Sequence, residues 1–502
     1  ILQPIIYGDW FDTKLITSVQ VHSNPYNYDY DGAGGDPGDE RGDFASFLVK
    51  RHYAQIQEAE LNLTSNDTSW GADWLTWSAG GFYFRNTQGF DPVEVTVGGL
   101  NAAELAGVGL PTDLADALSQ VTLPDGTTLG TGGGLTPAYA LSNIGTLRTE
   151  SWSGYFQTTA KLTDWFALTL GGRHQNERRG VLESKTDIRY GTSAITPPVF
   201  DWKNIGARDS RDNPVTGGTL PFTRTISGFS PKVTLDFKPF LAWGDEDTLL
   251  YATWQRATKA HSYNAFAFYY RPAYVPPETI KAYEVGLKGS LFDGAMRYST
   301  AAFFYQLTNL QTQFISLLNG GALSLDVAGN AESKGIDFDI TTFILPSTFD
   351  SLVMTLNGAY IDSTYTKYEN GDGQDPTTGI FGDNVRNYTG NRTTRTPKYS
   401  GSVALTNTWQ IPGGPLEASA NAYYNSGFFY VASEDPRYEQ EAYIIGGAKV
   451  SYLWEKNRFR TTLSVENIGD VFYTGGTLIL DPGMLASLGL QRMVGLKFQY
   501  TF

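Results

Sequence analysis

The segment between Ala260 and Pro277 is dense in residues that bind flat or negatively charged ligands. Its candidate binding residues, in chain order, are Tyr263, Phe266, Phe268, Tyr269, Tyr270 and Arg271. Aromatic faces stack on planar or sugar-like groups, and a guanidinium attracts anions. The segment therefore predicts a substrate-binding surface. The same composition is equally typical of an aromatic belt at a membrane interface, so the sequence leaves both interpretations open.

Two Gly-containing segments carry carboxylates at spacings that suit a hard cation. The first holds Asp29, Asp31 and Asp36, and the second holds Glu369, Asp372 and Asp375. Calcium takes several oxygen ligands from flexible backbone, so both segments are candidate calcium sites. Neither has the full spacing of an EF-hand loop, and a solvated acidic loop is the favoured interpretation.

Enzymatic chemistry finds little support in the sequence. The chain has no Cys, and its four histidines lie apart from one another, at His22, His52, His174 and His261. No G-x-S-x-G, H-E-x-x-H or Walker sequence is present. We therefore predict that the protein is not an enzyme and that calcium is its one candidate cofactor.

The composition excludes several classes of protein. Lys and Arg total 37 against 52 Asp and Glu, a net charge of −15 without a basic run, so a nucleic-acid partner is not expected. The longest apolar run is six residues, 265–270, which is far too short for a membrane helix. Abundant Gly and aromatic residues favour many strands joined by turns.

Alternation with a period of two is the clearest local pattern. At the C-terminus Val494, Leu496, Phe498, Tyr500 and Phe502 share one face of a strand, and polar residues or Gly occupy the other. Segments 459–466, 448–454 and 403–410 repeat the pattern. A soluble β-sandwich would also alternate, so the loops must separate the two interpretations.

Connections between the predicted strands alternate between short turns and long excursions. Residues 455–457, 412–415 and 292–295 are short, whereas 86–149, 180–224 and 366–395 are long. Short turns at one rim and long loops at the other are typical of transmembrane barrels of the outer-membrane type. The sequence therefore predicts an all-β, antiparallel, up-and-down barrel with sixteen recognisable strands between about Asp12 and Phe502.

Several motifs together resemble one family, the TonB-dependent receptors of Gram-negative outer membranes. The matching segments, in the order in which the family carries them, are Phe229-Ser230-Pro231-Lys232, Tyr283-Glu284-Val285-Gly286-Leu287-Lys288, Asn330-Ala331 with Gly335-Ile336-Asp337, Arg395-Thr396-Pro397-Lys398, and Glu466-Asn467-Ile468-Gly469-Asp470 with Tyr473. The aromatic end of the chain, with Phe498, Tyr500 and Phe502, resembles the family's signal for the barrel-assembly machinery. One departure is Ala257, which stands where the family usually has Gly.

The resemblance implies a barrel of about 22 strands in the cell outer membrane, in contact with lipid and lipopolysaccharide. It also implies a plug domain that fills the lumen, preceded by a TonB box. Neither is recognisable in residues 1–502, so we expect the plug to be truncated from this chain or supplied by a separate polypeptide. The implied function is TonB-dependent import of a scarce nutrient such as a ferric siderophore. A passive, porin-like or structural barrel without a plug is the alternative.

Overall fold

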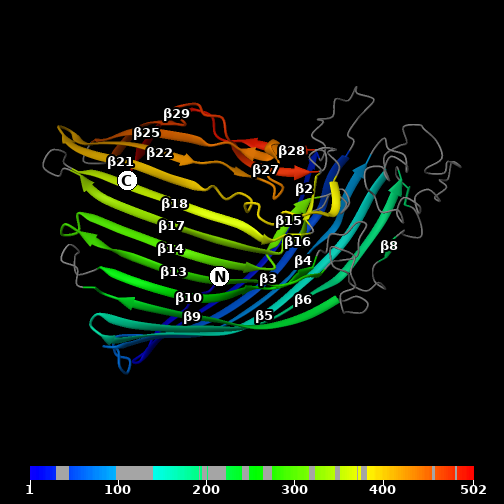
Figure 1. Ribbon diagram of the computed structural model, residues 1–502, viewed down its shortest axis with the longest axis horizontal. Helices are drawn as coiled ribbons and strands as arrows, with labels where there is room; N and C mark the ends of the chain where they lie inside the picture. Colours follow the sequence, from blue (N-terminus) through cyan, green and yellow to red (C-terminus); the bar gives the residue numbers. More distant parts are fainter. Residues whose placement is uncertain are drawn as a thin grey trace.

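The computed structural model describes residues 1–29, 45–97, 139–190, 193–194, 200–201, 222–239, 248–263, 274–315, 323–344, 351–369, 371–374, 381–454, 458–480 and 483–501. Most of them belong to one antiparallel sheet of 19 strands (Figure 1). Sixteen long strands form its wall: β2 (Phe11–Asp29), β3 (Ala45–Ser65), β4 (Leu75–Val97), β5 (Tyr139–Thr163), β6 (Phe166–Tyr190), β9 (Phe222–Phe237), β10 (Leu249–Lys259), β13 (Glu278–Leu291), β14 (Met296–Thr308), β17 (Asn330–Ile344), β18 (Leu352–Lys367), β21 (Tyr399–Ile411), β22 (Gly414–Asn425), β25 (Tyr443–Trp454), β26 (Phe459–Glu466) and β29 (Met493–Tyr500). The all-β class and the predicted sixteen strands are confirmed.

The remaining elements are short. The sheet also contains β1 (Ile5–Tyr7), β7 (Ser193–Ala194) and β8 (Phe200–Asp201). Five two-stranded hairpins lie outside it: β11 (Ser262–Tyr263) with β12 (Tyr274–Val275), β15 (Gln311–Ile315) with β16 (Leu323–Val327), β19 (Gly371–Gln374) with β20 (Phe381–Arg386), β23 (Phe428–Phe429) with β24 (Glu439–Gln440), and β27 (Thr474–Leu480) with β28 (Gly483–Leu488). A single turn of 3₁₀ helix, η3, spans Pro436–Tyr438. Within the described ranges, no helix has the length and apolar character needed to cross a bilayer.

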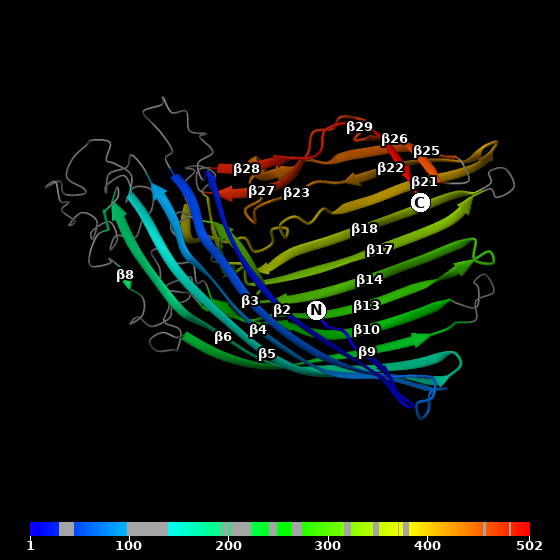
Figure 2. The same ribbon diagram turned by 180° about the vertical axis from the view of Figure 1, so that it is seen from behind.

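Each long strand pairs with the long strands before and after it in the chain, so the sheet is a meander that curves around a central axis (Figures 1 and 2). Its two edges differ. At one edge β1 pairs with β2, and Leu2 and Thr17 extend this ladder by two backbone hydrogen bonds of 3.0 Å. At the other edge β29 pairs, within the described residues, only with β26. All eight residues of β29 are exposed, as expected for a strand with one neighbour.

The two rims differ as the sequence predicts. Short turns join β5 to β6, β13 to β14 and β21 to β22 at one end, and the strand ends that the long connections join lie at the other end (Figure 1). Two predicted loops are shorter than expected, because β4 and β5 extend to Val97 and from Tyr139 into the segment 86–149, and β6 extends to Tyr190 in the segment 180–224. Gly89 and Pro92 are typical of turns, so the sequence hides a strand that the backbone ladder continues beyond them.

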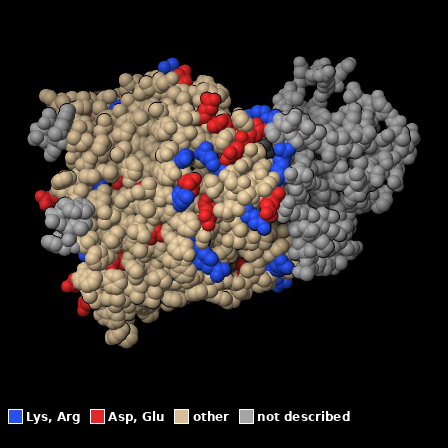
Figure 3. Space-filling model, in the orientation of Figure 1, with Lys and Arg blue, Asp and Glu red and all other residues tan. Residues whose placement is uncertain are grey.

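The two faces of the wall have opposite chemistry. On β13, Tyr283 and Val285 are exposed on one face, and Ala282, Glu284 and Gly286 lie on the other. In Figure 3 the visible outer face is largely uncharged, and charged side chains gather in a band toward the rim with the long connections. We therefore assign the apolar face to the outside of the barrel and the polar face to the lumen.

Aromatic side chains lie near both rims of the apolar face. Near the short turns Trp165 packs against Phe166 and Phe237, with ring centres 6.0 and 5.5 Å apart. Farther up the same strands Trp152 lies 5.8 Å from His174. These two levels correspond to the aromatic girdles that flank the apolar band of a membrane barrel.

Two glycines in the lumen wall make room for aromatic rings from neighbouring strands. A Cβ at Gly286 would overlap the ring of Tyr251, and a Cβ at Gly335 would overlap the ring of Phe303. Each ring covers backbone that the glycine leaves bare, which pins the register of the pair. The glycines of the motifs 283–288 and 330–337 are therefore explained by packing, because each leaves room for an aromatic ring of the neighbouring strand.

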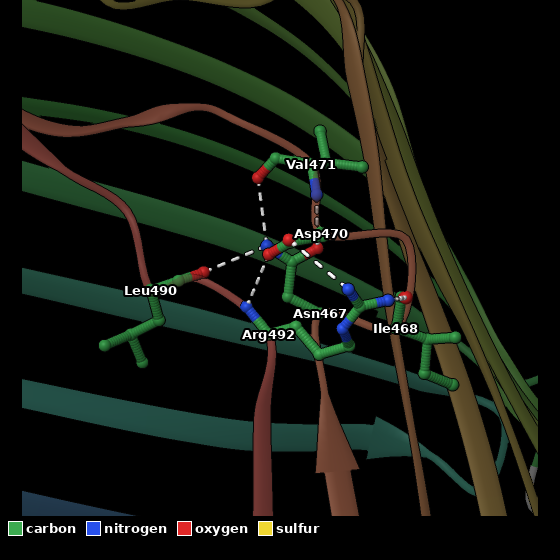
Figure 4. Close-up of polar contacts among 6 residues, drawn as sticks. All are labelled: Asn467, Ile468, Asp470, Val471, Leu490 and Arg492. Carbon is green, nitrogen blue, oxygen red and sulfur yellow. Dashed lines mark hydrogen bonds and ion pairs between the residues drawn. The ribbon is translucent and has the colours of Figure 1, made fainter.

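The last long connection begins with a compact hydrogen-bond network (Figure 4). Asn467 donates from Nδ2 to the carbonyl oxygens of Val471 and Leu490 and accepts at Oδ1 from the Val471 amide, each at 2.9 Å. Asp470 accepts at Oδ1 from the Arg492 amide at 2.9 Å. Asn467 and Asp470 have φ of 48° and 50°, a conformation that Asn and Asp adopt more readily than most residues. The network fastens both ends of the connection that carries β27 and β28.

Replacing Asn467 by Gly keeps the positive φ and removes all three side-chain hydrogen bonds. We expect the free energy of unfolding to fall by about 1–3 kcal/mol, because three partly buried backbone groups lose their side-chain partner. Guanidinium unfolding of the protein folded in lipid vesicles measures this change. Asp67→Ala, an exposed residue in the turn before β4, serves as the matched control and should shift the midpoint little. Equal midpoints for Asn467→Gly and the parent protein would contradict the assigned role.

Candidate functional site

A cluster of aromatic and basic side chains lies at the rim with the long connections, which we call the upper rim. There β11 and β12 meet the ends of β6 and β9. We call His261, Tyr263, Tyr274 and Arg224 the rim cluster. The ring centres of Tyr263 and Tyr274 are 5.5 Å apart, and those of His261 and Tyr274 are 5.6 Å apart. The Arg224 guanidinium lies 4.2 Å from the centre of the Tyr274 ring, a cation–π contact. Tyr263 also packs against buried Val181.

The imidazole of His261 is fully buried in this cluster. Neither ring nitrogen makes a well-formed hydrogen bond, although the backbones of Arg179 and Arg224 lie beside the ring. Burial, together with the positive charges of these two arginines, lowers the pKa of His261 to about 4. Burial likewise raises the pKa of Tyr263 to about 12. The cluster is therefore built around a neutral histidine.

Gln311 holds the strands around the rim cluster together. Its side-chain amide donates to the carbonyl oxygens of Ala260 and Pro276, at 3.0 and 2.8 Å. Its backbone amide donates to a carboxylate oxygen of Glu278 at 2.9 Å. Since Ala260 and Pro276 flank the aromatic segment, Gln311 and the β11–β12 pair fix both of its ends.

The structure places only one of the predicted substrate-binding residues. Tyr263 is 6% exposed, so its ring supports the rim. The other five predicted residues lie outside the described part of the chain: Phe266, Phe268, Tyr269, Tyr270 and Arg271. Their predicted contact with substrate stays a prediction.

A second group at the same rim links three of the long connections. Arg395 donates from its guanidinium to the backbone and side-chain oxygens of Thr477, both at 3.2 Å, and lies 5.5 Å from the centre of the Tyr430 ring. Arg392 lies 6.0 Å from the ring of Phe429. The R-x-P motif is therefore a brace at the rim, with φ of 56° at Arg395.

The lumen wall carries a carboxylate held by two tyrosines. The Tyr251 hydroxyl donates to Glu284 Oε1 at 2.8 Å, and the Tyr305 hydroxyl donates to Oε2 at 3.3 Å. Asp337 lies on the same face, near enough for its charge to act on that of Glu284. Beside it a concavity is lined by polar groups that include Asp337, Asp339, Asn357, Ser400 and Tyr423. This surface can accept cationic groups from the lumen.

Sequence reasoning singled out the motifs around Glu284, Asp337 and Arg395 but gave these side chains no role. Alternation alone puts Glu284 on the face opposite Tyr283, so its lumen orientation was readable. Its two tyrosine partners were not readable, because they come from β10 and β14 and depend on strand register.

The candidate calcium ligands are mostly beyond the described residues. Among those that are described, Glu369 lies 3.5 Å from the Lys367 ammonium, and no group of three His, Asp or Glu side chains is placed to hold a metal ion. Nothing is described of the side chains of Asp29 and Asp372, and Asp31, Asp36 and Asp375 lie outside the described ranges. Of the predicted assembly signal, Phe498 and Tyr500 are exposed on the outer face of β29, and Phe502 lies outside.

Known proteins resemble this chain in fold and in sequence. The ferric yersiniabactin uptake receptor of Yersinia pestis matches with a TM-score of 0.67 at 14% identity, over 99% of this chain and 60% of that one. The siderophore receptor PiuA of Acinetobacter baumannii matches with a TM-score of 0.61 at 16% identity, over 98% of this chain and 62% of that one. At these identities the likeness establishes the fold.

In sequence, the ferric-pyoverdine 358 receptor of Pseudomonas putida is 23% identical over 231 residues, which cover 45% of this chain and 24% of the relative. The chain thus spans less than two thirds of the length of each of these three proteins. The family model of the TonB-dependent receptor-like β-barrel matches residues 7–468, and the proteins named above are receptors rather than enzymes. The chain therefore belongs to the TonB-dependent receptor-like β-barrel family.

Proposed function

We propose that this chain forms the wall and the ligand-binding rim of a Gram-negative outer-membrane importer for a ferric siderophore. The observation that carries the proposal is the family match over residues 7–468. The names of the relatives, which are receptors for ferric chelates, support the same class of substrate. In lipid every backbone polar group needs a partner, and the continuous strand ladder supplies it for the strands between the two edges of the sheet.

Import requires partners that act on the wall. A plug domain fills the lumen and contacts the inner surface, where the Glu284 carboxylate and Asp337 accept its cationic groups. TonB, driven by the inner-membrane proton gradient, pulls on the plug to open a path. The barrel-assembly machinery recognises the end of β29 through Phe498 and Tyr500, and lipopolysaccharide surrounds the outer face.

The rim chemistry favours an anionic or aromatic ligand. Guanidinium groups lie over aromatic rings there in three pairs, formed by Arg224 with Tyr274, Arg392 with Phe429 and Arg395 with Tyr430. In each pair the arginine and the aromatic residue contact each other. The pairs therefore hold the connections at the rim in position. The ligand contacts are assigned to the aromatic segment that the rim cluster holds at both ends.

Uptake of ferric siderophores by iron-starved cells tests this function. Cells that carry the complete protein should take up at least one chelate, and uptake should stop when TonB is removed. The variant with Tyr269, Tyr270 and Arg271 all replaced by Ala should lose at least about tenfold in binding, since stacking and charge contacts are each worth about 1 kcal/mol or more. Phe292→Ala, in an exposed turn at the opposite rim, is the control and should keep full uptake.

Three results would contradict the proposal. Uptake that continues without TonB would favour a passive barrel, as would a large, constant conductance in planar bilayers. Full binding by the triple variant would remove the aromatic segment from the ligand site.

The burial of His261 predicts acid sensitivity of the rim. The unfolded chain binds a proton near pH 6.5 and the folded rim near pH 4, so stability is fully present above pH 6.5 and is lost as the pH falls toward 4. Between pH 7.5 and 4.5 the loss attributable to His261 should be roughly 2 kcal/mol. Unfolding midpoints of the parent and His261→Gln measure it, because the variant should lose less on acidification. His174→Gln, at an exposed position, should behave as the parent does.

Calcium binding by the two acidic segments is proposed separately. Calorimetric titration of chelator-treated protein with calcium tests it. Heat of binding and a raised melting temperature would support a site at Asp29, Asp31 and Asp36 or at Glu369, Asp372 and Asp375. The absence of both would identify these segments as solvated acidic loops.

A further inference from the structure

The outer face carries a pocket above the upper aromatic level. It is lined by Arg148, Glu150, Arg178, Gly180, Leu182 and Thr223. Arg148 and Glu150 come from β5, Arg178 and Gly180 from β6, and Thr223 from β9. Glu150 pairs across the ladder with Arg178, and Arg148 pairs with Gly180. Since paired residues point to the same face, the two arginines lie diagonally beside each other.

The same alternation fixes the side of the wall on which the pocket lies. Arg148 and Glu150 continue the row of Trp152 and Phe156 on β5. The side chains of these two aromatic residues are 53% and 50% exposed. Arg178 continues the row of Leu170 on β6. The pocket therefore faces the outside of the barrel, away from the lumen where substrate passes.

Its height follows from strand geometry. Phe166 lies at the lower aromatic level, and Arg178 lies farther along the same strand. The strand covers roughly 40 Å between them at ~3.3 Å per residue. With a tilt of roughly 40°, Arg178 lies ~30 Å above Phe166, just beyond an apolar band of about 25 Å. The pocket is thus at the level of the lipid headgroups.

The charges around the pocket are incompletely matched. The Glu150 carboxylate lies 3.6 Å from Arg85 on β4, so it serves a third arginine. Arg148 donates from Nε to the Thr87 hydroxyl at 3.3 Å. Among the described residues the Arg178 guanidinium makes neither an ion pair nor a hydrogen bond. Three arginines against one carboxylate leave local positive charge on a chain whose net charge is −15.

We propose that this pocket binds the phosphate-bearing headgroup of a lipopolysaccharide molecule in the outer leaflet. Guanidinium groups bind phosphate in a bidentate manner, and two of them in one concavity can hold one or two phosphates. Leu182 offers an apolar contact for the lipid, and the girdle below packs against its acyl chains. The inference rests on the proposed outer-membrane location and adds a specific lipid site to it.

The test uses protein extracted from outer membranes and depleted of lipopolysaccharide in detergent. Binding of purified lipopolysaccharide, of the same lipid after removal of its phosphates, and of inorganic phosphate alone is measured by native mass spectrometry and by the shift in melting temperature. The variants are Arg148→Gln with Arg178→Gln, and Arg148→Lys with Arg178→Lys. Lys497→Gln, which removes one positive charge from the inner face of edge strand β29, is the control.

Phosphorylated lipopolysaccharide should bind the parent protein and the control alike. The double Gln variant should bind at least about tenfold more weakly, because it loses two charge-assisted contacts, and the double Lys variant should fall between them. Equal binding of the dephosphorylated lipid, or equal weakening by Lys497→Gln, would overturn the proposal. Tight binding of inorganic phosphate alone would replace the lipid by a free anion as the occupant.

Siderophore uptake measured in the same variants separates this inference from the proposed function. Loss of lipid binding with uptake retained supports the lipid site and leaves import intact. Failure of import in cells carrying the parent protein, with lipid binding preserved, would reject the importer alone. A double Gln variant that fails to fold is recognised by its altered electrophoretic mobility, and the double Lys variant then carries the comparison.

Discussion

The structure depends on the requirement that backbone amides and carbonyls inside a bilayer find partners within the protein. An antiparallel meander satisfies this requirement for every strand with two neighbours, and in the described part of the chain fifteen such ladders join the sixteen long strands. Because the ladder satisfies the hydrogen bonds of the backbone, the side chains on the two faces of the sheet can differ in polarity. One face is apolar toward lipid and the other is polar toward the lumen. The low overall hydropathy and the absence of long apolar runs follow from this division.

The same division separates structural from functional chemistry. In the lumen wall, aromatic rings over Gly286 and Gly335 fix the register, and that register brings Tyr251 and Tyr305 onto Glu284. At the rim the backbone ladder ends, and side-chain hydrogen bonds hold the long connections instead. Asn467, Gln311 and Arg395 each bind backbone groups of other segments there. The rim therefore depends on individual polar side chains, whereas the wall depends on a repeating pattern.

Sequence reasoning succeeded where one rule acts at a time. Strands β25, β26 and β29 were predicted because each of them has one apolar and one polar face. The strand ends within 86–149 and 180–224 were missed, although Val93, Val95 and Val97 alternate with Glu94 and Thr96, because that short alternation follows Gly89 and Pro92, which are typical of turns. The burial of His261 and Tyr263 could not be predicted, since it arises from neighbours on β6 and β9, among them Val181 and Arg224, that lie far away in sequence. The pocket around Arg178 was missed for the same reason, as it needs three strands in register.

The directions of the two edge strands determine whether the complete barrel has an even or an odd number of strands. Strand β1 runs antiparallel to β2, and β29 runs antiparallel to β26, so β1 and β29 both point toward the rim with the short turns. Two strands that point the same way cannot be antiparallel neighbours. A closed antiparallel wall that contains both edges therefore needs an odd number of further strands between them, which makes the complete ring even-numbered, as in bacterial single-chain barrels.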